Sequence, residues 1–176
     1  MQRLLLTGIL ILAAPVLAAP ANAAVRSGPP GNDFYTPPAS LPKGPHGTPV
    51  WQRKLTGPAV LKGAKSNTLL LYRSTAVDGS TVAVSGDVAI PKGRAPKGGW
   101  PVISWAHGTV GIADACAPSK VGTQANYDSP LLNRWLKAGY AVVRTDYEGL
   151  GTPGVHPFLV GTSEVSLDGV TFRAQG

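Results

Sequence analysis

The sequence predicts an α/β fold whose central sheet is mixed, mostly parallel, and begins with an antiparallel hairpin. Residues 81–90 alternate apolar side chains with small or polar ones, which is typical of a strand in an antiparallel pair. Two short, continuously apolar runs follow at residues 101–106 and 140–145, as expected for strands covered on both faces. A helical pattern separates these two runs, and a strand–helix–strand crossover implies that they lie parallel.

The predicted hairpin consists of residues 68–74 and 81–90, joined by a turn at residues 77–80 (VDGS). One face of its second strand is expected to carry the apolar residues Val82, Val84, Val88 and Ile90. The other face is expected to carry Ala83, Ser85, Asp87 and Ala89. Because the second set is small or polar, we expect that face to be solvated.

A helix is predicted between the two apolar runs. Ser129 is expected to cap it, Pro130 to occupy its first helical position, and Gly139 to end it. The expected apolar stripe consists of Leu131, Leu132, Trp135 and Leu136.

The amino-terminal 23 residues are predicted to be a secretory signal peptide. Arg3 supplies a positive charge, residues 4–17 form an apolar run too short for a comfortable membrane span, and residues 21–23 (ANA) suit cleavage. A secreted, extracellular protein is therefore expected, and a retained membrane anchor is the alternative. Residues 24–49, rich in Pro and Gly, predict an extended lead-in, and residues 50–176 an incomplete α/β domain.

The formal charge of +7 is concentrated in the first 100 residues. The basic residues are scattered among Gly and Pro, without a basic helix or interleaved aromatic residues. This distribution favours a solvated basic surface over a nucleic-acid site, so no nucleic-acid partner is expected. Weak contact with anionic lipid or cell wall is an alternative.

A glycine-rich turn, residues 107–111 (HGTVG), follows the first apolar run. Functional groups gather at the carboxyl ends of parallel strands. Acyl-transfer enzymes bind the developing oxyanion through backbone N–H groups, and glycine allows a close approach because it has no Cβ. The turn is therefore a candidate oxyanion hole, and a plain tight turn with a structural histidine is the alternative.

A second polar turn, residues 146–151 (DYEGLG), follows the second apolar run. Its glycines, continued to Gly154, have the spacing of a dinucleotide-binding motif. However, Pro153 obstructs the helix that this motif requires, and Asp146 and Glu148 place negative charge where phosphate would bind. We therefore predict no nucleotide site and interpret Asp146 and Glu148 as loop anchors.

Together, PVISWAHGTVG, DACAPS at residues 114–119 and GYAVVRTDYEGLG resemble the secretory lipase family of α/β-hydrolases, over about residues 33–170. The resemblance implies an α/β-hydrolase fold and hydrolysis of carboxylic esters, including acylglycerols, without cofactor or metal. It places the oxyanion hole at His107, Gly108 and Thr109, with the N–H of Thr109 or Gly108 as donor. It also implies that Cys116, alone in the chain, pairs with a more distant cysteine; a free thiol is the alternative.

The sequence contains no G-x-S-x-G elbow. The nearest match, residues 161–165 (GTSEV), lacks the second glycine, so Ser163 is interpreted as a helix cap. His46, His107 and His156 all precede the position where a triad histidine is expected, and they lack the spacing of metal ligands.

By the resemblance, the catalytic Ser, Asp and His are expected beyond Gly176. We therefore expect this chain to be a truncated, inactive fragment of a triacylglycerol lipase-like ester hydrolase that acts through an acyl-serine mechanism. A non-catalytic secreted binding protein on a partial hydrolase scaffold is the alternative, and a peptidase or polyester-degrading relative is a third interpretation.

Overall fold

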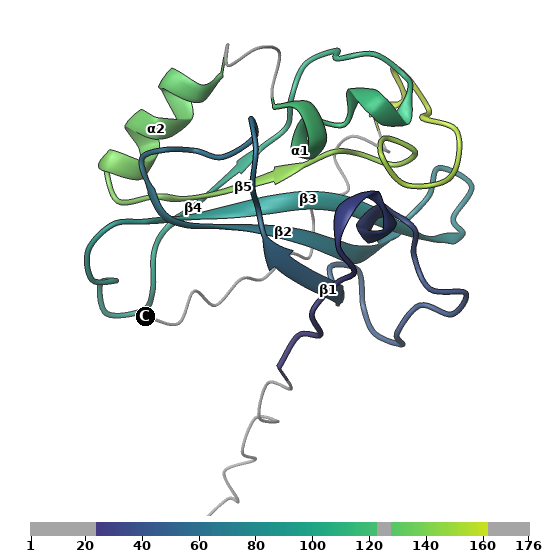
Figure 1. Cartoon of the computed structure of the whole chain (residues 1–176), viewed down its shortest axis with the longest axis horizontal. Helices are drawn as coiled ribbons and strands as arrows, with labels where there is room; N and C mark the ends of the chain where they lie inside the picture. The colour runs from purple at the N-terminus through teal and green to yellow at the C-terminus, as the bar shows by residue number, and fades with distance from the viewer. Residues whose placement is uncertain (1–23, 123–127, 162–176) are drawn as a thin grey trace, which may run out of the picture.

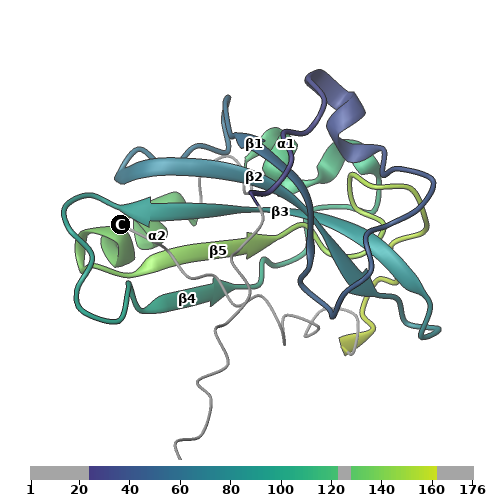
Figure 2. The ribbon, with the colours of Figure 1, turned by 90° about the horizontal axis from the view of Figure 1, so that it is seen from below.

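A computed structural model describes residues 24–122 and 128–161. They contain a five-stranded sheet in the order β1-β2-β3-β5-β4 (Figure 2). The strands are β1 (Pro49–Lys54), β2 (Ala64–Thr75), β3 (Thr81–Pro91), β4 (Val102–Trp105) and β5 (Ala141–Thr145). β4 and β5 pair in parallel and the other neighbours pair antiparallel, which confirms a mixed sheet with a hairpin at its start. The predicted signal peptide and Ser163 lie outside the described residues.

Two α-helices lie above the sheet in Figure 1, α1 (Pro118–Val121) and α2 (Ser129–Lys137). Two 3-10 helices, η1 (Gly31–Tyr35) and η2 (Asp114–Cys116), complete the helices and strands of the described part of the chain. Because α2 connects the parallel strands β4 and β5, the predicted strand–helix–strand unit is confirmed. Over residues 24–122 and 128–161, every helix is too short or too polar to cross a membrane.

The second face of β3 is buried, and our expectation that it is solvated was wrong. Ser85 and Asp87 are 0% and 2% exposed, and their apolar neighbours on the same face are equally covered. The polar side chains tolerate burial because each has a partner supplied by β5 or the turn that follows it. Strand alternation therefore identified the two faces but not which of them contacts water.

Asp87 forms a buried ion pair with Arg144 of β5. The guanidinium donates to Asp87 Oδ1 from Nη2 at 2.7 Å and from Nε at 3.0 Å, and Nη2 also donates to the Ala59 carbonyl at 2.6 Å. Burial raises the pKa of Asp87 to about 6, and Arg144 opposes this rise. The pair links β3 to β5 and holds the β1–β2 loop against the sheet.

β4 is more exposed than the sequence predicts. We expected residues 101–106 to be covered on both faces, yet Val102 is 44% exposed and Ser104 is also exposed. In the described part of the chain β4 is an edge strand, because it pairs only with β5. β5 lies between β3 and β4 and is buried along its whole length, as predicted.

The start of α2 also differs from its prediction. Ser129 is the first residue of the helix rather than its cap, and Asp128 occupies the N-cap without a side-chain hydrogen bond. Leu132 and Leu136 are buried against the sheet, whereas Leu131 is 40% exposed. The buried stripe is therefore narrower than the apolar stripe of the sequence.

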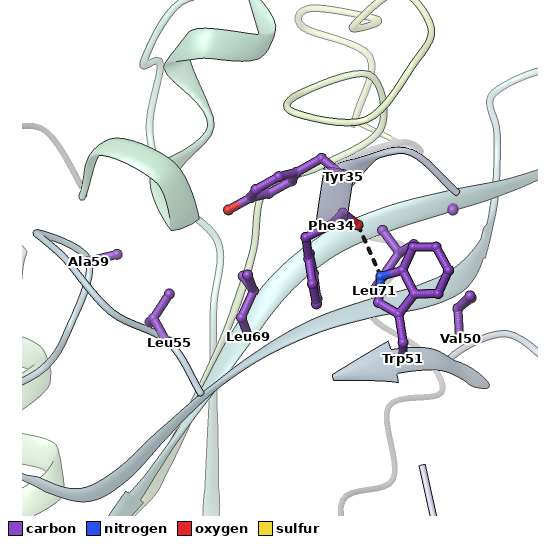
Figure 3. Close-up of a cluster of buried hydrophobic side chains, with 9 residues drawn as sticks. Phe34, Tyr35, Val50, Trp51, Leu55, Ala59, Leu69 and Leu71 are labelled. Atoms are coloured by element: carbon purple, nitrogen blue, oxygen red, sulfur yellow. Dashed lines mark hydrogen bonds between the residues drawn. The ribbon is translucent and has the colours of Figure 1, made fainter. Parts of the chain in front are cut away.

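The Pro- and Gly-rich lead-in contributes to the core. Phe34 of η1 is completely buried against β1 and β2. The Phe34 carbonyl accepts a hydrogen bond from Trp51 Nε1 at 2.9 Å (Figure 3). A short 3-10 helix forms in such a segment because it needs only one or two i→i+3 bonds. The buried members of this cluster are Phe34, Tyr35, Val50, Trp51, Leu55, Ala59, Leu69, Leu71 and Ala83.

Asp146, directly after β5, joins three segments of the fold. Its buried carboxylate accepts hydrogen bonds from Ser85 Oγ of β3 at 2.6 Å, from Ser119 N of α1 at 2.8 Å, and from Ser119 Oγ. Tyr35 of η1 bonds to Ser119 Oγ at 2.9 Å, and burial raises the pKa of Tyr35 to about 12, so its hydroxyl keeps its proton. Asp146 is thus a loop anchor, as predicted.

We predict that Asp146→Ala lowers the free energy of unfolding by about 3 kcal/mol or more, because three buried donors lose their acceptor. Asp146→Asn keeps a carbonyl acceptor and is expected to cost less. Urea denaturation measures both. The control is Asp33→Ala at an exposed position, with an expected change within about 0.5 kcal/mol. Equal stability of Asp146→Ala and the control would contradict the anchoring role.

Candidate functional site

The two polar turns meet at the edge of the sheet where β4 and β5 end. In Figure 2 the yellow-green chain that follows β5 lies beyond the arrowheads of both strands. The ring centroids of His107 and Tyr147 are 4.2 Å apart, and the Tyr147 hydroxyl donates to the His107 carbonyl at 2.8 Å. The turns are 40 residues apart in sequence, and the parallel pairing of β4 and β5 brings them into contact.

A small pocket of about 140 Å³ lies between these turns. Residues of the glycine turn form one part of its lining. Aromatic and apolar residues of the segment after β5 form the rest. All three predicted oxyanion-hole residues contribute. The lining consists of His107, Gly108, Thr109, Val110, Gly111, Tyr147, His156, Phe158 and Leu159.

His107 is 7% exposed and bonds within its own turn. Its Nδ1 lies 2.7 Å from the carbonyl oxygen of Gly108. Because a carbonyl can only accept, Nδ1 carries the proton in this contact. Nε2 is buried and has no hydrogen-bond partner among the described residues.

His156 also belongs to this site, although the sequence did not predict that it does. Its ring stacks on Tyr147 with centroids 6.1 Å apart and planes 3° apart, and its Nδ1 lies 2.9 Å from the Glu148 carbonyl. It is 8% exposed and lines the pocket. No sequence signal indicated this role, because His156 stands in no motif and reaches the pocket only where the loop after β5 folds back.

The two glycines of the first turn differ in what surrounds them. A Cβ added to Gly108 would meet no atom within 4 Å, so this part of the backbone borders open space beside the pocket. Gly111 has a φ of 115°, and a Cβ there would lie 2.5 Å from Cys116 Sγ. Gly111 is therefore required by the turn itself, whereas Gly108 leaves its backbone accessible.

Cys116 lies partly buried beneath the glycine turn. It packs against the cluster of Ala117, Tyr147 and Leu150, and its side chain is close to Gly111. It is a free cysteine in this chain, which contains no second one. Its disulfide with a more distant cysteine stays a prediction.

The turn after β5 does not have the geometry of a dinucleotide-binding motif. Residues 146–154 form turns and bends rather than the helix that would follow the strand. Tyr147 has a φ of 69°, and all three glycines of the motif spacing also have positive φ values. The described backbone here offers no helix N-terminus to a phosphate.

A serine–histidine pair occurs elsewhere in the fold. Ser74 Oγ of β2 lies 2.8 Å from His46 Nε2 in the lead-in. Neither residue lines the pocket, and among the described residues no carboxylate bonds to the His46 ring. The pair therefore ties the lead-in to β2 and lacks the third member of a triad.

Comparison with known proteins gives a structural likeness but no match in sequence. No protein-family model matches the chain, and no curated protein is significantly similar to it. The fold is similar to lipase A of Candida antarctica in its closed state, with a TM-score of 0.54 and 26% identity over 64% of this chain and 28% of that one. A second structure of that lipase gives 0.56 and 25%, over 68% and 30%.

The chain is also similar to LipA, the rice cell wall degrading esterase of Xanthomonas oryzae. The TM-score is 0.52 and the identity 26%, over 68% of this chain and 34% of that one. This chain thus spans about a third or less of the length of the structures it matches. The chain has the α/β-hydrolase fold of these lipases and esterases over the amino-terminal part of that fold, as the resemblance to the secretory lipases predicted.

Proposed function

We propose that the turn at His107, Gly108 and Thr109 forms the oxyanion hole of a secreted serine hydrolase of carboxylic esters, with triacylglycerol-type substrates. One observation carries the proposal. The accessible backbone of Gly108 borders a pocket at the carboxyl ends of β4 and β5, in a chain with the fold of lipases and esterases. This is the place where the fold class collects its reacting groups.

The chemistry needs donors aimed at one oxygen atom. When a serine hydroxyl attacks an ester carbonyl, negative charge develops on the carbonyl oxygen. The N–H of Gly108 or Thr109 would donate to that oxygen, and such a donor lowers the barrier by about 2.7–4 kcal/mol. The apolar side chains of Phe158 and Leu159 in the pocket lining suit the acyl part of the substrate. The tetrahedral intermediate then expels the alcohol, which takes up the serine's proton, and leaves an acyl-serine. Water hydrolyses this acyl-serine to the free carboxylic acid and restores the serine hydroxyl, and no cofactor is required.

The nucleophile is proposed to come from sequence outside these 176 residues. The chain has no G-x-S-x-G elbow, and it covers only 28–34% of the similar structures. The buried serines nearest the site, Ser85 and Ser119, are both bonded to Asp146, and no described histidine bonds to either. The described residues would therefore offer an oxyanion site without an attacking group.

We predict that the purified 176-residue chain does not hydrolyse p-nitrophenyl butyrate, because loss of the triad serine and histidine removes on the order of 10⁶ in rate. Reading the genomic DNA past codon 176 in all three frames is expected to reveal a G-x-S-x-G followed by Asp and His. The product of that longer frame is expected to be active. Turnover by the monomeric 176-residue chain would contradict this proposal, and absence of the elbow from every frame would favour a non-catalytic binding protein.

We also predict that two alanine substitutions in the glycine turn affect different properties, one the catalytic efficiency and the other the stability. In the product of the longer frame, Gly108→Ala is expected to leave thermal stability unchanged but to lower kcat/KM roughly 10²-fold, because the methyl group enters open space beside the pocket.

The matched variant is Gly111→Ala, which is expected to lower the free energy of unfolding by about 1–3 kcal/mol, since its φ of 115° strains any residue with a Cβ. Thermal melts and ester kinetics on both proteins separate the two effects. A fully active Gly108→Ala enzyme would exclude this turn from the oxyanion site.

A further inference from the structure

Side chains hold the carbonyl groups of two successive residues in the glycine turn. The Tyr147 hydroxyl donates to the His107 carbonyl at 2.8 Å, and His107 Nδ1 donates to the Gly108 carbonyl at 2.7 Å. These carbonyls belong to the peptide units 107–108 and 108–109. The orientation of both peptide units is therefore fixed by hydrogen bonds, one of which comes from the turn after β5.

Holding a carbonyl group also aims the N–H of the same peptide unit. A trans peptide is planar, and its C=O and N–H point in opposite directions. The described residues contain no cis peptide. Because the His107 carbonyl points at the Tyr147 hydroxyl, the N–H of Gly108 points away from it. In the same way, the contact of the Gly108 carbonyl sets the direction of the Thr109 N–H.

We infer that Tyr147 is a positioning residue of the oxyanion hole, acting through the peptide unit that joins His107 to Gly108. This inference rests on the proposed function. Oxyanion donors act because they are oriented before the reaction and need no rearrangement during it. The Tyr147 hydrogen bond supplies that orientation, and it also polarises the peptide, which makes the Gly108 N–H a stronger donor.

Tyr147 is itself held firmly enough for this task. It is 5% exposed, and its ring packs against His107 and stacks, with nearly parallel planes, on His156. Its φ of 69° is unfavourable for a residue with a bulky side chain and is maintained by the surrounding structure. Ring packing alone requires no hydroxyl, so the hydroxyl can be removed while the stacking is kept.

The test uses the isotope-labelled 176-residue chain and butyrate, a small carboxylate that stands in for the oxyanion. NMR titration follows the amide signals of Gly108 and Thr109. In wild type, butyrate is expected to shift at least one of them. In Tyr147→Phe, the affinity is expected to fall roughly fivefold, the effect of losing one hydrogen bond. The residual dipolar coupling of the Gly108 N–H is expected to change, while the signals of β2 and β3 stay in place.

Two further variants make the test specific. Tyr140→Phe is the matched control, because Tyr140 packs edge-to-face against Trp135 with centroids 5.3 Å apart and lies outside the pocket lining. It is expected to bind butyrate as wild type does. Tyr147→3-fluorotyrosine keeps the packing and makes the hydroxyl a stronger donor, so it is expected to tighten binding even if Tyr147→Phe folds poorly.

The outcomes distinguish the inference from the proposed function. If butyrate shifts neither the Gly108 nor the Thr109 amide signal of wild type, the oxyanion site itself is refuted. The positioning role of Tyr147 is then refuted as well. If wild type responds but Tyr147→Phe and Tyr147→3-fluorotyrosine respond equally well, the site stands and the role of Tyr147 is refuted. An unchanged dipolar coupling of Gly108 in a folded Tyr147→Phe chain also refutes it.

Discussion

The buried carboxylate of Asp146 is the interaction on which the arrangement of the site depends. A buried charge is tolerated only when hydrogen bonds compensate for its lost hydration, and here donors from β3 and α1 supply them. Ser85 and Ser119 are thereby joined to the carboxyl end of β5. The turn that carries Tyr147 therefore starts from a fixed point of the fold, and it can hold the neighbouring strand end in place.

Tyr147, the residue after Asp146, connects the end of β5 to the glycine turn that follows β4. Its ring lies between His107 and His156, and its hydroxyl bonds to the backbone of the glycine turn. The backbone of Gly108 is thus oriented by groups that this chain contains. Under the proposed function, this amino-terminal part of an α/β-hydrolase fold would supply the oxyanion donor, and a separate segment would supply the attacking serine.

The largest hydrophobic cluster and the candidate site occupy different parts of the sheet. The antiparallel strands β1 to β3 carry the large cluster around Phe34 and Trp51, and the lead-in covers it. The parallel strands β4 and β5 carry the pocket, and β4 is exposed at the edge of the described sheet. The buried Asp87–Arg144 pair couples the two parts, because it joins β3 to β5. Through this pair, the antiparallel part of the sheet is joined to the strand that leads into the candidate site.

The sequence by itself determined the hairpin, the helix between two parallel strands and the position of the glycine turn. These features depend on local periodicity and on backbone preferences of nearby residues. Three segments, PVISWAHGTVG, DACAPS and GYAVVRTDYEGLG, were also enough to indicate the resemblance to the secretory lipases. Only the tertiary structure decided that Ser85 is buried, that Phe34 belongs to the core and that His156 lines the pocket. Each of these depends on partners distant in the sequence, such as Ser85 and Asp146, which are 61 positions apart, and no local pattern encodes such a contact.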